Sequence, residues 1–264
     1  MEVERPFASL TLQNSESQSQ RPLKMKLAPK VVFLFRDSEG FASSIADALH
    51  PSPSSSAQRV EQPLELPLDR YGVRDQMARG LIVNFIVNGI HQVSMVLLDN
   101  YEPPILACAV NEVLSQILEA SSSMLMIIAP FLVPSSKLKL ESRSLTRNGS
   151  KVPLYSVQVG SETDTSRAVA AQTDKAPLSL QIHYEPLACF LQLVNVLKLP
   201  TSILIGQRSQ SFSDKAFSKE LEALYKIGDL LESTTSLCFS KDMISWNPSK
   251  SSRDGEEPWR ALYG

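Results

Sequence analysis

The chain is poor in the residues that most catalytic and metal sites require. Its 264 residues include only 3 histidines and 3 cysteines, and no pair of them has the spacing of metal ligands. The longest apolar stretch, residues 124–133, is interrupted by Pro130 and falls far short of the roughly 20 residues of a membrane helix. The first residues carry acidic side chains and no apolar core of signal-peptide length. We therefore expect neither a membrane span nor a secretion signal.

The few cysteines also bear on the compartment. Cys108, Cys189 and Cys238 are odd in number, far apart in the sequence and flanked by apolar residues. This pattern favours buried thiols in a reducing compartment over a framework of disulfides.

No excess of either charge is present. With 26 basic and 28 acidic residues the formal net charge is −2, which argues against a general binder of nucleic acids or membrane surfaces. The stretch from Lys137 to Lys151 is locally basic but contains no aromatic residue that could stack on bases. We interpret this stretch as a solvated loop.

Familiar catalytic motifs are missing as well. The sequence contains no glycine-rich phosphate loop and no G-x-S-x-G nucleophile elbow. His50, His91 and His183 are scattered, and we interpret them as surface or cap residues. Asp37 and Glu39 follow the first apolar run, where α/β enzymes often place a carboxylate, but the position also suits the N-terminal cap of the next helix. We prefer the cap and expect no catalytic residue, cofactor or metal.

Apolar runs alternate with amphipathic segments through the middle of the chain. Asn88-Gly89 lies between two apolar runs and predicts a β-hairpin, because both central positions of the turn need positive φ. Pro186 suits the first turn of a helix, and Pro200 marks its end. Strands are expected at 30–35, 81–87, 90–98, 123–129, 153–159 (an edge strand) and 201–206, helices at 40–49, 103–118, 185–197 and 213–233, and loops at 50–56 and 161–175.

This alternation predicts an α/β fold: a mixed, largely parallel sheet with helices on both faces, in a single domain with flexible termini. The expected domain spans residues 30–240, after a disordered leader at 1–29 and before a flexible tail at 241–264. Leu118 and Phe217 are among the helical side chains expected to face the core.

The last three residues, Leu262, Tyr263 and Gly264, combine three groups that a binding site can recognise. Leu262 offers an apolar side chain, Tyr263 a phenol that can bury its ring while its hydroxyl keeps a partner, and Gly264 a free α-carboxylate for a lysine. Roughly one unrelated chain in a hundred would end in a similar way by chance, so this ending needs support from the rest of the chain.

That support comes from a resemblance in the second half of the sequence. Within Pro177–Leu231, a helix begun by Glu-Pro-Leu-Ala, then Lys-Leu-Pro and an apolar strand (EPLACFLQLVNVLKLPTSILIGQ) resemble the C-terminal half of the proteasome assembly chaperone 1 family. The segments SMLMIIAPFLVPSS and VPLYSVQ resemble it more weakly, and residues 1–75 match poorly. That family also ends in a hydrophobic residue, a tyrosine and one further residue, as this chain does.

The resemblance implies a non-catalytic chaperone of the cytoplasm or nucleus. Such a chaperone pairs with proteasome assembly chaperone 2 as a heterodimer and sits on the α-subunit ring of the 20S proteasome during assembly. It implies that Leu262, Tyr263 and Gly264 form the proteasome-docking motif. The poor match of the first 75 residues leaves the pairing surface in that half unassigned.

Two other functions fit the same residues. One is an α/β hydrolase- or phosphorylase-like enzyme with Asp37, Glu39 or His91 in a cleft; a pocket where titratable groups converge would favour it. The other is a different proteasome regulator or client with the same tail. Association with immature α-rings rather than mature particles would separate an assembly role from this one.

Overall fold

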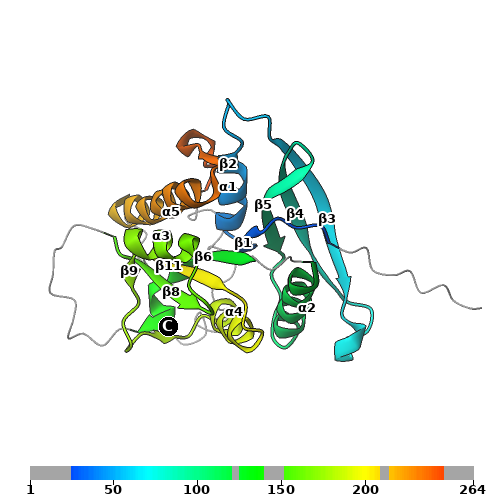
Figure 1. Ribbon diagram of the computed structural model, residues 1–264. Coiled ribbons are helices and arrows are strands. Elements are labelled where there is room, and N and C mark those ends of the chain that lie inside the picture. The colour runs from blue at the N-terminus through cyan, green and yellow to red at the C-terminus, as the bar shows by residue number, and fades with distance from the viewer. Residues whose placement is uncertain (1–24, 121–124, 140–151, 209–213, 247–264) are drawn as a thin grey trace, which may run out of the picture.

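An eight-stranded mixed sheet organises the computed structural model, which describes residues 25–120, 125–139, 152–208 and 214–246 (Figure 1). The strand order is β3-β4-β5-β1-β6-β11-β8-β9. The strands are β1 (Lys30–Phe35), β3 (Gln58–Pro67), β4 (Met77–Val87), β5 (Ile90–Leu98), β6 (Met126–Pro134), β8 (Leu154–Val159), β9 (Asp174–Lys175) and β11 (Thr201–Arg208). The helices are α1 (Phe41–Ala48), α2 (Ile105–Ala120), α3 (Asp164–Gln172), α4 (Glu185–Val196) and α5 (Asp214–Thr235). Two-residue strands β2 (Leu49–His50), β7 (Leu138–Lys139), β10 (Gln181–Ile182) and β12 (Cys238–Phe239) form two small additional ladders.

The centre of the sheet is parallel. Strand β1 pairs in parallel with β5 on one side and β6 on the other, and β6 pairs in parallel with β11. Its sequence, KVVFLF, is apolar after the first residue, and all five apolar side chains are buried. A continuous apolar run of this kind is typical of a parallel strand covered on both faces.

The hairpin predicted at Asn88-Gly89 is confirmed. Asn88 and Gly89 have φ of 50° and 78°, the positive values that the turn requires. Strands β4 and β5 on either side are antiparallel. This hairpin and β3 form an antiparallel edge of the sheet, and β8 pairs antiparallel with β11 on the other side.

Helices cover both faces, as the sequence predicted. Helices α2 and α4 contact each other and pack on one face, where their buried side chains join those of Val31, Phe33 and Ile127. Helices α1 and α5 contact each other on the opposite face, against Val32, Leu34 and Ile128 (Figure 1). Alternate residues of β1 and β6 thus enter two separate cores, as the two-residue period of a strand dictates. The predicted fold class is therefore confirmed.

Some local predictions were wrong. Strand β3 was not predicted, because Pro63 and Pro67 interrupt it and most of its side chains are exposed; both features are tolerated at a sheet edge. Residues 161–175 are not a loop but contain α3, which begins at a capping box formed by Thr163 and Ser166. Few apolar residues mark this helix, since Val169 and Ser166 are its buried residues.

Three further expectations concern side-chain burial, the edge of the sheet and membrane spans. Leu118 and Phe217 do not face the core but are 46% and 39% exposed. Strand β8 is not the edge of the sheet, because β9 pairs with it on the side away from β11. No helix in the described ranges is long and apolar enough to cross a membrane.

The folded body extends past both limits of the expected 30–240 domain. Met25 and Ala28 are buried, and the Ala28 backbone N–H donates to Ser94 Oγ at 2.8 Å. At the other end a 3₁₀ turn at Lys241–Met243 leads to Trp246, which is also buried. Residues 25–29 and 241–246 thus belong to the body rather than to the expected leader and tail.

Candidate functional site

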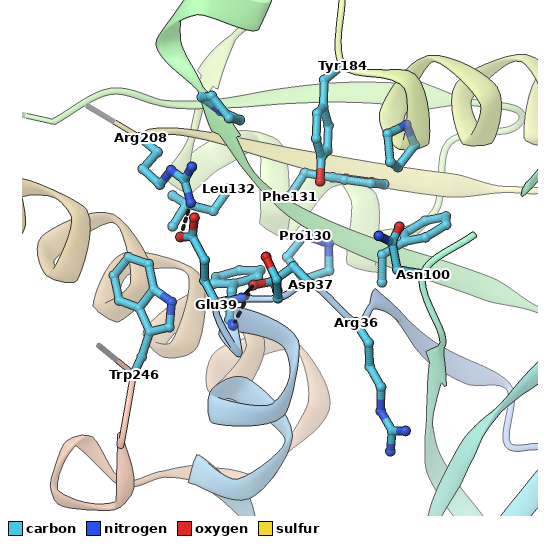
Figure 2. Close-up of a pocket in the computed structure, with 15 residues that line it drawn as sticks. Arg36, Asp37, Glu39, Asn100, Pro130, Phe131, Leu132, Tyr184, Arg208 and Trp246 are labelled. Carbon is cyan, nitrogen blue, oxygen red and sulfur yellow. Dashed lines mark hydrogen bonds and ion pairs between the residues drawn. The ribbon is translucent and has the colours of Figure 1, made fainter. Parts of the chain in front are cut away.

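The described part of the chain has a cavity at the carboxyl ends of the parallel strands. Residues Lys30–Val32 of β1 pair with Met126–Ile128 of β6, and beyond these residues the two strands no longer pair. Pro130, which has no N–H for a ladder, follows in β6. A cavity of about 210 Å³ lies here, between the ends of β1, β6 and β11 and the segment around Trp246 (Figure 2). The carboxyl edge of a largely parallel sheet is where α/β proteins most often bind ligands.

Asp37 lies in the cavity wall and caps helix α1. Its Oδ1 accepts the backbone N–H of Glu39 at 2.9 Å and of Phe41 at 3.2 Å, and its Oδ2 accepts that of Ala42 at 3.2 Å. The cap interpretation of this carboxylate is therefore confirmed. Burial raises the pKa of Asp37, although the backbone hydrogen bonds and the charge of Arg208 act in the opposite direction.

The two arginines of the wall are each paired with a carboxylate. Arg208, at the end of β11, forms an ion pair with Glu39, whose side chain is 11% exposed. Arg36 Nη1 lies 2.9 Å from Asp99 Oδ1, and in Figure 2 its side chain points away from Tyr184 and Trp246. The arginines and the two acids of the wall make its formal charge close to neutral.

Aromatic rings form much of the remaining wall. Phe35 and Phe131, at the ends of β1 and β6, have ring centroids 5.4 Å apart. Tyr184 precedes α4, and its ring stands over the cavity with the hydroxyl directed towards Pro130 and Asp37 (Figure 2). Burial, and secondarily the negative charge of Asp37, raise the pKa of this phenol. The phenol therefore stays protonated at neutral pH and can donate a hydrogen bond.

Trp246 closes the cavity opposite Tyr184 and was not found by sequence reasoning. The pattern of Pro, Ser and charge after Lys241 placed it in the tail, whereas its side chain is 5% exposed and belongs to the core cluster around α1 and α5. Its ring stacks on Phe217 at a centroid distance of 6.4 Å. Its Nε1 is buried and has no hydrogen-bond partner among the residues that the structure describes. A single tryptophan in a polar segment carries no signal in the sequence for a buried position.

None of the three histidines is among the residues that line this cavity. His50 is in β2, with Nδ1 at 2.9 Å from Pro51 O; His91 is in β5; and His183 precedes α4. The cavity thus contains Asp37 and Glu39 but not His91, the third residue considered for an enzyme. Across the described ranges no cluster of three or more His, Cys, Asp or Glu side chains could hold a metal ion.

The cysteines are free thiols but less buried than expected. Cys108 on α2, Cys189 on α4 and Cys238 on β12 are all partly exposed. Packing of α2 against α4 brings Cys108 and Cys189 into neighbouring positions, and burial, followed by the charge of Cys108, raises the pKa of Cys189. A raised pKa keeps this thiol protonated and poorly nucleophilic.

The predicted docking residues Leu262, Tyr263 and Gly264 lie outside the described residues, as do residues 140–151 of the basic stretch. Their predicted roles stay predictions.

Comparison with solved structures supports the fold. A protein of unknown function from Thermoplasma acidophilum matches with a TM-score of 0.52 and 14% identity, over 97% of this chain and 98% of that one. Weaker matches include PbaB, an archaeal proteasome activator from Pyrococcus furiosus (TM-score 0.46, 9% identity, 84% and 90% covered). A proteasome-assembly chaperone homologue from Mycobacterium tuberculosis (0.43, 14%, 89% and 99%) also matches. An MTA/SAH nucleosidase has a comparable score (0.44, 8%, 80% and 96%).

The match to the Thermoplasma acidophilum protein shows the fold alone, and an identity of 14% transfers no activity to this chain. A comparison with curated proteins finds no match. Residues 25–264 match the model of one family, DUF7894, which is described as a domain of unknown function. Since this match covers most of the sequence, the chain belongs to the DUF7894 family.

Proposed function

We propose that this chain is a non-catalytic proteasome assembly chaperone. In this proposal it pairs with proteasome assembly chaperone 2, a related α/β protein, and promotes assembly of the 20S α-ring in the cytoplasm or nucleus. Its last three residues, Leu262, Tyr263 and Gly264, dock on the α-subunits.

The observation that carries the proposal is the unit formed by α4 and β11. The sequence resemblance to the assembly chaperone family is most specific here, and the unit has the expected helix, turn and strand. Pro186 lies in the first turn of α4, and Lys198 adopts φ of 55° where the helix ends. Leu199 N donates to Val194 O at 2.9 Å, which closes the last turn before Pro200. The structure of this unit therefore supports the resemblance at the residues on which the resemblance is based.

The position of Trp246 suits a docking role for the tail. Trp246 anchors the chain to the body, and 18 residues follow it (264 − 246). With the flexible tail predicted from the sequence, a random coil of this length would have a root-mean-square reach of about 21–25 Å. The docking motif could then enter a site on a neighbouring subunit while the body stays paired with its partner.

Binding to purified 20S particles tests the docking step. A few residues appended after Gly264 remove the carboxylate from that position, and Tyr263→Ala removes the phenol. Each change should weaken binding at least about tenfold, because a buried aromatic and a charge-assisted contact each contribute more than about 1.4 kcal/mol. Arg260→Ala, outside the motif, is the matched control and should matter little, mainly at low salt. Wild-type binding by both the extended chain and Tyr263→Ala would refute the docking role.

A second test addresses the assembly role itself. The chain, purified from cells with its C-terminus untagged, should recover immature α-rings in preference to mature particles. Recovery of mature particles alone would instead favour a regulator or client that uses the same tail.

The cavity keeps an enzymatic alternative open, because a carboxyl group with a raised pKa is typical of catalytic sites. A hydrolase- or phosphorylase-like reaction would use Asp37 or Glu39. Substitution Asp37→Asn should leave α-ring assembly intact in cells if the protein is a chaperone. A strong assembly defect in a stably folded Asp37→Asn protein would favour the enzyme.

A further inference from the structure

Trp246 presents a buried hydrogen-bond donor to the cavity. Its side chain is 5% exposed, and Nε1 has no partner within the part of the chain that the structure describes. The indole lines the cavity, and Figure 2 shows its nitrogen on the side that faces Asp37 and Glu39. A buried donor without a partner destabilises a protein, so its persistence at a cavity wall points to an acceptor supplied from outside.

Asp37 is a buried acceptor that lacks a positively charged partner within the described part of the chain. Its oxygens accept backbone N–H groups, but no cationic side chain of the described ranges forms an ion pair with it. The two nearest guanidinium groups of the wall are already paired, Arg208 with Glu39 and Arg36 with Asp99. The raised pKa of Asp37 agrees with a carboxylate that lacks compensation for its burial. A cation or strong donor in the cavity would supply that compensation.

Size and lining restrict the ligand further. The cavity has a volume of about 210 Å³, which is enough for a ligand the size of an amino acid. The rings of Phe35, Phe131 and Tyr184 provide apolar surface and π faces that attract a cation.

We propose that this cavity binds a small amino-acid-like zwitterion. Its ammonium group pairs with Asp37, its carboxylate or carbonyl oxygen accepts from Trp246 Nε1, and its side chain packs on Phe131 and Tyr184. This site is separate from the C-terminal motif of the proposed function and does not depend on it.

Isothermal titration calorimetry of the full chain with each of the twenty free L-amino acids tests this. At least one should bind saturably with 1:1 stoichiometry. Its N-acetyl derivative, which lacks the ammonium, should bind about tenfold or more weakly, whereas its amide, which keeps a carbonyl acceptor, should retain measurable binding. The amide also distinguishes a site for a free amino acid from a site for the N-terminal residue of a peptide. Only a peptide site would bind the amide more tightly than the free amino acid.

Two variants assign the contacts. Trp246→Phe removes the N–H but keeps a ring on Phe217, so affinity should fall about 3–10-fold while the protein still folds, with only a modest loss of stability. Asp37→Asn should weaken binding about tenfold or more. Asp47→Asn, which changes an exposed carboxylate within α1, is the matched control and should bind like wild type.

The proposal is overturned if no amino acid binds at up to about 10 mM, a range that covers weak metabolite sites. Binding that is unchanged in both Trp246→Phe and Asp37→Asn would also overturn it, because the ligand would then lie elsewhere. If Asp37→Asn impairs folding, Trp246→Phe alone decides, since that variant keeps the backbone hydrogen bonds that Asp37 accepts at the start of α1.

Discussion

Trp246 provides the sharpest test of where the folded body ends. Replacing it with alanine removes a side chain that is 5% exposed, packs with the α1 and α5 cluster and stacks on Phe217. Enclosed Trp→Ala substitutions cost about 3–5 kcal/mol. Trp246 also borders a cavity, and its stacking partner is 39% exposed, so its packing is incomplete on two sides. We therefore expect the free energy of unfolding to fall by about 2–4 kcal/mol.

The chain provides its own control, because Trp259 is its other tryptophan. Trp259→Ala, in the predicted tail, should change stability by less than about 0.5 kcal/mol, as substitutions away from a packed core do. Urea unfolding of the two variants, followed by circular dichroism and fitted with a common slope, measures the difference. Equal stabilities would refute the packing of Trp246 against the body. Trp246 would then belong to the tail and would not line the cavity.

Two other predictions concern the charge of Asp37 and the oligomeric state. Burial raises the folded-state pKa of Asp37 above its ordinary value of 3.8. The unfolded chain therefore loses this proton first, so stability falls as pH rises from 3.8 to the folded pKa and then levels off. Asp37→Asn should abolish this component of the pH dependence of urea unfolding, while the control Asp47→Asn should keep it. An unchanged pH profile in Asp37→Asn would contradict the burial of this carboxylate. By light scattering, the chain alone should self-associate and should form a 1:1 complex once proteasome assembly chaperone 2 is added. A monomer that does not bind this partner would contradict the proposed pairing.

Local patterns were sufficient for the elements with strong short-range signals. Asn88-Gly89 allows few conformations other than a tight turn, and the apolar period of α4 between Pro186 and Pro200 leaves one helical face to bury. The continuous apolar run of β1 requires cover on both faces, which is why the α/β class could be predicted before any contact was known.

The candidate site could be predicted only in part. Asp37 and Glu39 were recognised from their place after the first strand, and the cap role of Asp37 follows from the same local spacing. Arg208, Tyr184 and Trp246 come from segments far apart in the sequence, and no local period relates them to Asp37.

The sequence by itself determined the alternation of strands and helices, because side-chain period and turn residues act over a few positions. Only the tertiary structure decided that β3 completes the sheet edge, that α3 forms between Gly160 and β9, and that Trp246 belongs to the core. The cavity arises where β1 and β6 stop pairing after Val32 and Ile128. Strand separation of this kind depends on how whole layers pack on the sheet, and packing between distant segments leaves no mark on the local residue pattern.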